Sequence, residues 1–124
     1  MIRRTKQEKI FYYTQPGFFK KKLDEFNQAE EKVTWLLGKY EELRNSDKLL
    51  LFYYWRLVND YQGELEDNDI LNLTPGETIT RVRRYIQNTL NLFLPTDEDV
   101  IRAREISALA VSEWARNQGR IIID

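Results

Sequence analysis

The sequence predicts an all-α or mostly α fold: a compact helical domain with a helix-turn-helix-like unit and short extended segments at both termini. Two observations predict it. Apolar residues recur at spacings of three, four and seven, the period of helices that bury one stripe. Helix-start residues precede several stripes, namely Ser46, the segment Thr74-Pro75-Gly76-Glu77 and Thr96. We therefore expect four to six helices.

The stripes and the residues that stop helices give five helical stretches. In chain order they are one long or two shorter helices over 18–43, a central helix over 46–62, a short helix over about 67–73, an arginine-rich helix from Thr74 to about Asn88, and a last helix from Thr96 to Gly119. The apolar run Leu49 to Trp55 has strand propensity, but the capping residue Ser46 favours a helix. The inner face of the last helix is expected to hold Val100, Ala103, Ile106, Ala110 and Trp114.

The chain is expected to form one domain between two terminal segments. The turn at Pro16-Gly17 ends a basic and aromatic N-terminal arm over 1–17. A single helical domain then spans 18–118, a length that suits one hydrophobic core. After Gly119 we expect a β-prone C-terminal tail over 119–124 that contains Ile121, Ile122 and Ile123.

The composition excludes most enzyme chemistry. The chain has no histidine and no cysteine, so it offers no imidazole base, thiolate nucleophile, disulfide or zinc-finger site. One acidic group is left as a metal candidate, and it comprises Glu64, Glu66, Asp67 and Asp69. It lacks the glycine turn and the distal glutamate of a calcium loop, so we interpret it as a solvated connector. We expect no enzymatic activity, no cofactor and no metal site.

Membrane insertion is not expected either. The longest apolar run, Leu49 to Trp55, has seven residues, far fewer than the ~20 that a membrane-spanning helix needs. The basic start of the chain leads into no signal-peptide core. We expect a soluble, cytoplasmic protein without a membrane partner.

The arginine-rich helix is the first candidate for a functional surface. A long helix, a short helix, a turn and this helix follow one another in the order of a helix-turn-helix, and Leu92 to Pro95 is the place of a vestigial wing. A stripe of Ile79, Val82, Ile86 and Leu90 is expected to be buried, which leaves polar side chains outside. We expect Arg81 and Arg84 to contact phosphates or guanine edges, with Arg83 on a flank. Further contacts that tune the binding are expected from Thr78, Thr80, Gln87 and Asn88. Additional affinity for the phosphate backbone of the nucleic acid is expected from the arm residues Arg3, Arg4, Lys6 and Lys9. The expected partner is nucleic acid, with DNA favoured over RNA.

The charge distribution leaves a second interpretation open. The net charge is −1, whereas nucleic-acid-binding domains usually have a basic bias, and arginines on one side of a helix are often only solvated. The charge is uneven, however: residues 1–48 hold 11 basic and 8 acidic side chains, whereas residues 49–73 hold one basic and five acidic. The basic arm and the arginine-rich helix can therefore still form one positive face.

Several segments resemble a set of small uncharacterised proteins of tailed phages and prophages. They are Arg44 to Leu50, Tyr54-Trp55, Thr78 to Gln87 and Leu94 to Thr96, within a resemblance that covers about residues 32–104. The resemblance implies a phage origin, a winged-helix-like core and the cytoplasm of a bacterial host. It supplies no catalytic residue, and the N-terminal arm and the isoleucine tail lie outside it.

Aromatic residues in the arm and isoleucines in the tail predict an alternative function. Aromatics interleaved with Lys20-Lys21-Lys22 can stack on single-stranded nucleic acid or form a protein interface. The tail is similar to an edge strand, which is open to β-augmentation or to pairing in a homo-oligomer. The alternative is a module that docks on a host or phage complex, as inhibitor or assembly factor, through Tyr12, Tyr13, Phe18, Ile121, Ile122 and Ile123.

Overall fold

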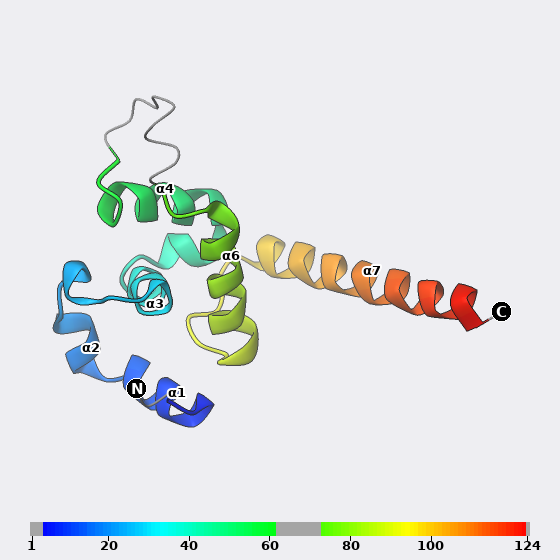
Figure 1. The fold of residues 1–124 in the computed structure, drawn as a ribbon, viewed down its shortest axis with the longest axis horizontal. Coiled ribbons are helices and arrows are strands. Elements are labelled where there is room, and N and C mark those ends of the chain that lie inside the picture. Colours follow the sequence, from blue (N-terminus) through cyan, green and yellow to red (C-terminus); the bar gives the residue numbers. More distant parts are fainter. Residues whose placement is uncertain (1–3, 62–72, 124) are drawn as a thin grey trace. The chain divides into compact units, whose positions relative to one another are not determined.

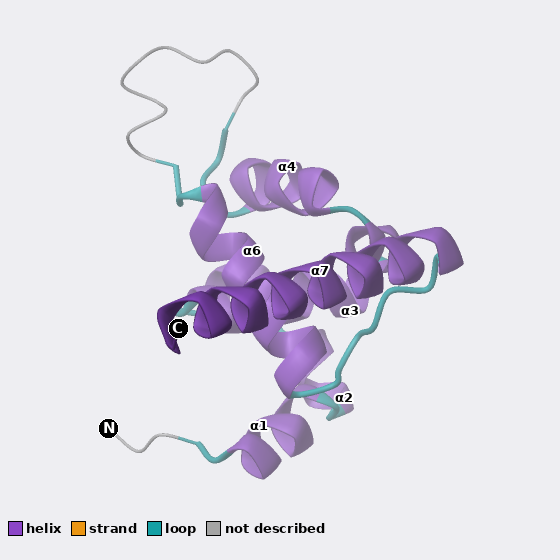
Figure 2. Cartoon of the chain, turned by 90° about the vertical axis from the view of Figure 1, so that its right-hand side faces the viewer, coloured by secondary structure: helices purple, strands orange, loops and turns teal. Residues whose placement is uncertain are grey.

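A computed structural model describes residues 4–61 and 73–123, most of which form helices (Figure 1). The helices are α1 (Lys6–Tyr13), α2 (Pro16–Lys20), α3 (Ala29–Lys39), α4 (Asp47–Leu57), α6 (Gly76–Arg84) and α7 (Glu98–Ile123), with 3₁₀ turns at Leu23–Glu25 and Glu41–Asn45 and a π-helical turn at Tyr85–Thr89. The described residues contain no strand (Figure 2), so the predicted all-α fold is confirmed. Within them, no helix combines the length and the apolarity needed to cross a membrane.

The predicted helix-turn-helix-like unit stays a prediction. Most of its expected short helix, 67–73, lies outside the described residues. The acidic group Glu64 to Asp69 lies outside them as well.

Two compact units make up the chain, Met1–Leu94 and Pro95–Asp124. The predicted domain over 18–118 differs from this division at both ends. The arm belongs to the first unit, since Tyr13 is buried in it. The last helix belongs to the second unit.

The core of the first unit lies where α3, α4 and α6 meet. Eight buried residues form it: Val33, Leu36, Leu37, Leu43, Leu50, Tyr54, Ile79 and Ile86. Burying one such aliphatic side chain stabilises the fold by about 1.5–3 kcal/mol. Helix α4 contributes one side only, because Leu49, Phe52 and Leu57 are exposed. It also ends at Leu57, so the central helix expected over 46–62 is shorter than predicted.

The N-terminal arm is helical, which corrects the predicted extended segment. The hydroxyl of Thr5 starts α1 by accepting a hydrogen bond from the N–H of Glu8 at 3.2 Å. The apolar side of α1 is buried because Tyr13 packs with Phe18, whose ring centroid lies 5.2 Å away. Burial of one apolar side stabilises a short helix that would be marginal alone.

Two capping predictions on the first unit had different outcomes. Ser46 is confirmed as the cap of α4, since its hydroxyl accepts a hydrogen bond from the N–H of Leu49 at 3.2 Å. Thr74 does not cap α6, which begins at Gly76. The Thr74 hydroxyl instead accepts a hydrogen bond from the side-chain amide of Asn59 at 3.2 Å.

The second unit is built around α7. The carboxylate of Asp97 accepts a hydrogen bond from the N–H of Asp99 at 2.9 Å, so α7 begins one residue later than the predicted cap Thr96 implies. The helix runs through Gly119 to Ile123, and the predicted β-prone tail over 119–124 is therefore wrong. A glycine inside a helix costs only about 1 kcal/mol relative to alanine, and a formed helix propagates through β-branched residues.

Candidate nucleic-acid interface

Helix α6 and the π-helical turn after it carry most of the predicted nucleic-acid contacts. Ile79 and Ile86 lie in the core as expected. The buried side also includes Arg83 and Gln87, which are 6% and 1% exposed. A π turn advances each residue by less rotation than an α turn, so the turn Tyr85–Thr89 brings Gln87 toward the core.

Hydrogen bonds within the chain engage Arg83 and Gln87. Arg83 donates to the carboxylate of Asp47 twice, from Nε to Oδ1 at 2.9 Å and from Nη2 to Oδ2 at 2.8 Å. Its Nη1 donates to the side-chain oxygen of Gln87 at 3.4 Å. The amide nitrogen of Gln87 donates to the carbonyl of Phe93 at 2.8 Å. The expected positions of Arg83 on an outer flank and of Gln87 on the outer side are therefore wrong, because both side chains join α6 to its neighbours in the fold.

The loop after the π-helical turn folds back toward that turn. Asn91 and Phe93 have φ values of 55° and 49°, in the left-handed region that non-glycine residues seldom adopt. This backbone allows the carbonyl of Phe93 to meet Gln87. The segment Leu92 to Pro95, where a vestigial wing was expected, contains a bend at Phe93 and no strand.

The outer side of α6 and its π-helical turn holds Arg81, Arg84 and Asn88, which are all exposed. Spacings of three and four place them in one row, called here the arginine row. Within the described part of the chain, no hydrogen bond or ion pair engages these three side chains. Thr78 and Thr80 lie half-buried beside the row. The Thr80 hydroxyl donates to a backbone carbonyl in the first turn of α6 at 3.3 Å.

Lys9 of α1 lies beside α6 and its π-helical turn. Its Nζ donates to Oε1 of Glu30 at 3.0 Å and to the hydroxyl of Tyr85 at 3.2 Å. Burial lowers the pKa of Lys9, but these hydrogen bonds and the charge of Glu30 outweigh burial and raise the pKa above its usual value. Lys9, Glu30 and Tyr85 line a hollow of about 330 Å³ together with Arg81 and Val82. The arm and the arginine row therefore border the same hollow.

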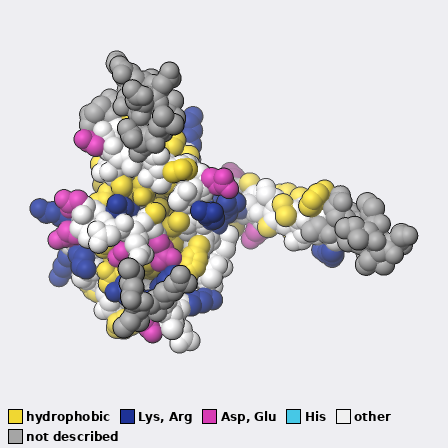
Figure 3. Space-filling model, viewed as in Figure 1, with side chains coloured by type: hydrophobic (Ala, Val, Ile, Leu, Met, Phe, Trp, Pro, Cys, Tyr) yellow, Lys and Arg dark blue, Asp and Glu magenta, His cyan; other side chains and the backbone are white. Residues whose placement is uncertain are grey.

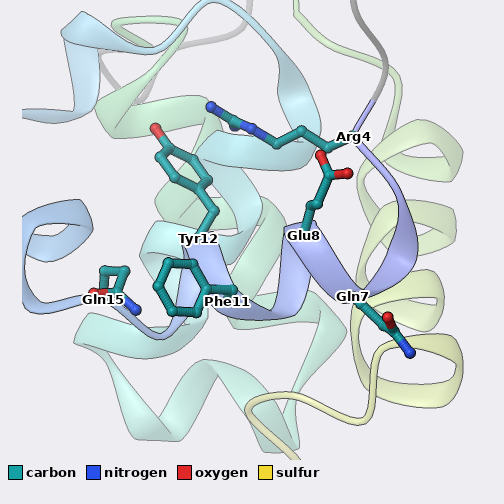
Figure 4. A pocket seen from close by; sticks show the side chains of 6 residues that line it. All are labelled: Arg4, Gln7, Glu8, Phe11, Tyr12 and Gln15. Carbon is teal, nitrogen blue, oxygen red and sulfur yellow. The ribbon is translucent and has the colours of Figure 1, made fainter.

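The other arm cations occupy different positions. The guanidinium of Arg4 lies 3.7 Å from the ring centroid of Tyr12, on a side of α1 where Phe11 is largely exposed. The open hollow there, of about 420 Å³, is lined by Arg4, Gln7, Glu8, Phe11, Tyr12 and Gln15 (Figure 4). Lys6 is exposed on α1, and Arg3 lies outside the described residues.

Two residues of the predicted protein interface are buried in the fold. Tyr13 and Phe18 are buried in an aromatic cluster, so their assignment to an interface is wrong. The Tyr13 hydroxyl donates to Oε2 of Glu30 at 2.5 Å, and burial together with this bond raises the pKa of Tyr13 far above its usual value. Tyr12 is half-buried and stacks with Arg4. The backbone of Ile121 to Ile123 belongs to α7, and the structure describes only the backbone of these residues.

Two acidic residues that hold the interface in place have no signal in the sequence. The partner of Asp47, Arg83, lies 36 positions away. Glu30 accepts from both Lys9 and Tyr13. No local pattern links residues so far apart, so the sequence carried no signal for either contact.

The candidate interface thus consists of the arginine row and the hollow that Lys9 shares with Arg81. Within the described residues, no group of three or more acidic side chains is placed to hold a metal ion. Comparison with protein-family models, curated proteins and solved structures finds no match for this chain.

Proposed function

We propose that this chain is a small, non-enzymatic accessory protein of phage type that binds nucleic acid, DNA in preference to RNA, in the cytoplasm of a bacterial host. The binding surface is the outer side of α6, which acts as the recognition helix of a helix-turn-helix-like unit. The observation that supports this best is the contrast between neighbouring arginines. Arg83 donates its hydrogen bonds inward to Asp47, while the exposed Arg81 and Arg84 have no such partner in the described residues.

The chemistry of the arginine row suits phosphates and base edges. A guanidinium is planar and always charged, and it donates two parallel hydrogen bonds to a phosphate or to a guanine edge. The amide of Asn88, one turn after Arg84, has the donor and acceptor that an adenine edge requires. Thr78 and Thr80 have hydroxyls beside the row, although the hydroxyl of Thr80 already donates to the backbone.

The hollow beside the row provides a place for one phosphate. Lys9 and Arg81 both line it, so two cations converge there. Glu30 lines it too and already accepts a hydrogen bond from Lys9 at 3.0 Å. A phosphate in this hollow is therefore held mainly by Arg81, while Lys9 offsets the repulsion by Glu30.

The test is fluorescence anisotropy with labelled duplex DNA and duplex RNA at low salt. The double variant Arg81→Ala/Arg84→Ala is expected to bind DNA about 10-fold or more weakly, because it loses two charge-assisted contacts. The matched control is Lys48→Ala/Arg56→Ala, which removes two exposed cations from α4 and should bind like the wild type. A wild-type protein that binds neither nucleic acid, or equal weakening in both variants, would contradict the proposal.

A second candidate function is supported by the outer side of α4. Exposed Leu49, Phe52 and Leu57 lie there, and a hollow of about 370 Å³ is lined by Tyr40, Phe52, Tyr53, Arg56 and Leu57. Aromatic residues with one arginine are typical of the centre of a protein interface. In this alternative the chain docks on a host or phage protein, with α4 as the contact surface in place of the buried Tyr13 and Phe18.

A pull-down from nuclease-treated extract of the bacterial host distinguishes nucleic-acid binding from protein docking. If α4 is the docking surface, the same captured protein is lost with Phe52→Ser and kept with Arg81→Ala/Arg84→Ala. Capture that is insensitive to Phe52→Ser argues against the α4 surface.

A further inference from the structure

The second unit, Pro95–Asp124, has large apolar side chains but no buried residue among those described. Four of them are exposed on α7: Ile106, Leu109, Val111 and Trp114. Figure 3 shows hydrophobic side chains along the described part of this helix. Three of them, Ile106, Val111 and Trp114, lie toward one side of the helix, and exposed large apolar residues that lie close together mark an interaction surface.

One side of α7 is built mainly from small residues in a heptad pattern and ends in Trp114. Val100, Ala103, Ser107, Ala110 and Trp114 are spaced alternately by three and four residues, so they form one stripe, which Ile106 and Val111 flank. Leu109 lies away from the stripe, on the side that carries Arg102, Glu105, Glu113 and Arg116. Four stripe residues belong to the inner face that the sequence predicted, whereas the predicted Ile106 flanks the stripe.

The length and the period of the α7 stripe define what can cover it. Helix α7 has 26 residues, and 26 residues of α-helix extend over about 39 Å. The alternation of three and four over residues 100–114 is covered best by another helix of the same period, whose side chains fit between those of the first. We propose that the α7 stripe pairs with the α7 stripe of a second copy of this chain, in antiparallel orientation.

Charge favours the antiparallel orientation. The first turn of α7 follows Asp97 and contains Glu98 and Asp99, whereas Arg116 lies toward the opposite end. Parallel pairing would bring the acidic starts of two helices together, and their helix dipoles would repel as well. Antiparallel pairing places each acidic start next to the half of the other helix that carries Arg116.

Side-chain size favours the same orientation and fixes a register. When Ser107 is opposite Ala110 of the second copy, Trp114 is opposite Ala103. Large side chains then face small ones along the stripe, which is how packed helices fill space. Parallel pairing would instead place Trp114 against Trp114 and alanine against alanine.

The oligomeric state of the full chain, without nucleic acid, tests the pairing. Sedimentation equilibrium is expected to show a dimer for the wild type. Trp114→Glu, in the stripe, should weaken dimerisation about 100-fold or more, because it puts a charge into the interface. Leu109→Glu is the matched control, since Leu109 is 62% and Trp114 64% exposed, and it should leave dimerisation unchanged. A monomeric wild type, or a dimer that survives Trp114→Glu, overturns the proposal.

A second measurement tests orientation without changing the stripe. The chain has no cysteine, so Arg102→Cys takes a single spin label on the polar side of α7. The proposed register offsets the two labels at position 102 by about 20 Å along the pair, whereas a parallel pair has no such offset. A label at Leu109→Cys lies on the same side of α7 and near the centre of the pair, so it has almost no offset in either orientation and serves as the reference. A distance at 102 that is no longer than the distance at 109 overturns the antiparallel arrangement.

Discussion

Arg83 and Asp47 form a two-bonded ion pair, with N–O distances of 2.9 and 2.8 Å, between the last turn of α6 and the first turn of α4. The pair fixes the rotation of α6 about its axis, because the side that carries Arg83 has to face α4. Residues Arg81 and Arg84 are then left on the outer side. An inward arginine thus determines which arginines are available to a ligand.

Replacing Arg83 is expected to destabilise the first unit. Arg83→Met keeps much of the side-chain volume but removes both hydrogen bonds to Asp47. The expected loss is about 2–3 kcal/mol in the free energy of unfolding, less than for a fully buried pair because Asp47 is 38% exposed. Urea unfolding followed by circular dichroism measures it. Arg84→Met, an exposed neighbour, should change stability by less than ~0.5 kcal/mol, and equal losses in the two variants would show that the ion pair does not stabilise the fold.

Gly38 is expected to be intolerant of alanine although it lies inside α3. Alanine ordinarily stabilises a helix interior by about 1 kcal/mol relative to glycine. Here a Cβ atom would lie 2.2 Å from Cε1 of Phe19, whose ring is held against Phe93 at a centroid distance of 5.6 Å. Gly38→Ala is therefore expected to lower the free energy of unfolding by about 1–3 kcal/mol.

Two comparisons check this explanation of Gly38. A Cβ atom at Gly17 meets nothing within 4 Å, so Gly17→Ala should be neutral or stabilising. In a Phe19→Leu background the ring is gone, and Gly38→Ala should cost less than in the wild type. If the cost is the same with and without Phe19, the close approach to its ring is not the cause.

Stability is expected to fall at alkaline pH through the cluster around Glu30. The folded state raises the pKa of Lys9 above 10.5 and that of Tyr13 above 10.0. A raised pKa in the folded state gives stability that is complete below the unfolded pKa and is lost as the pH rises above it. The free energy of unfolding should therefore be flat with respect to these groups near neutral pH and decrease above about pH 10. Tyr13→Phe removes one ionisable group, so its decrease above pH 10 should be shallower, and a slope equal to that of the wild type would contradict the assignment to Tyr13.

Local features of the fold were predictable from the sequence, and features that depend on distant partners were not. The cap at Ser46 and the helices around it follow from neighbouring residues, whose effects act within one turn. The burial of Arg83 and Gln87 depends on Asp47 and Phe93, which reach them only after the chain has folded. The amphipathic pattern placed Gln87 outside because it assumed an α-helical period, whereas the chain forms a π-helical turn there.

The ends of the chain illustrate a different reason for error. The helix α1 had a local signal in Thr5 and Glu8, but the turn at Pro16-Gly17 favoured a separate arm. At the other end, Gly119 and the strand propensity of the three isoleucines after it predicted that the helix stops there. The structure reverses both expectations, since α1 docks on the core and α7 continues to Ile123.

The salt dependence of DNA binding tests the role of the arginine row most directly. The affinity for one labelled duplex is measured at several salt concentrations, for the wild type, Arg81→Ala/Arg84→Ala and Lys48→Ala/Arg56→Ala. Each lost phosphate contact lowers the slope of log affinity against log salt by about 0.9. The slope is therefore expected to fall by about 1.8 in the Arg81 and Arg84 variant, if both contact phosphates, and to stay unchanged in the control. A slope that is the same in all three proteins, or no binding by the wild type at low salt, would contradict the arginine row as a nucleic-acid surface.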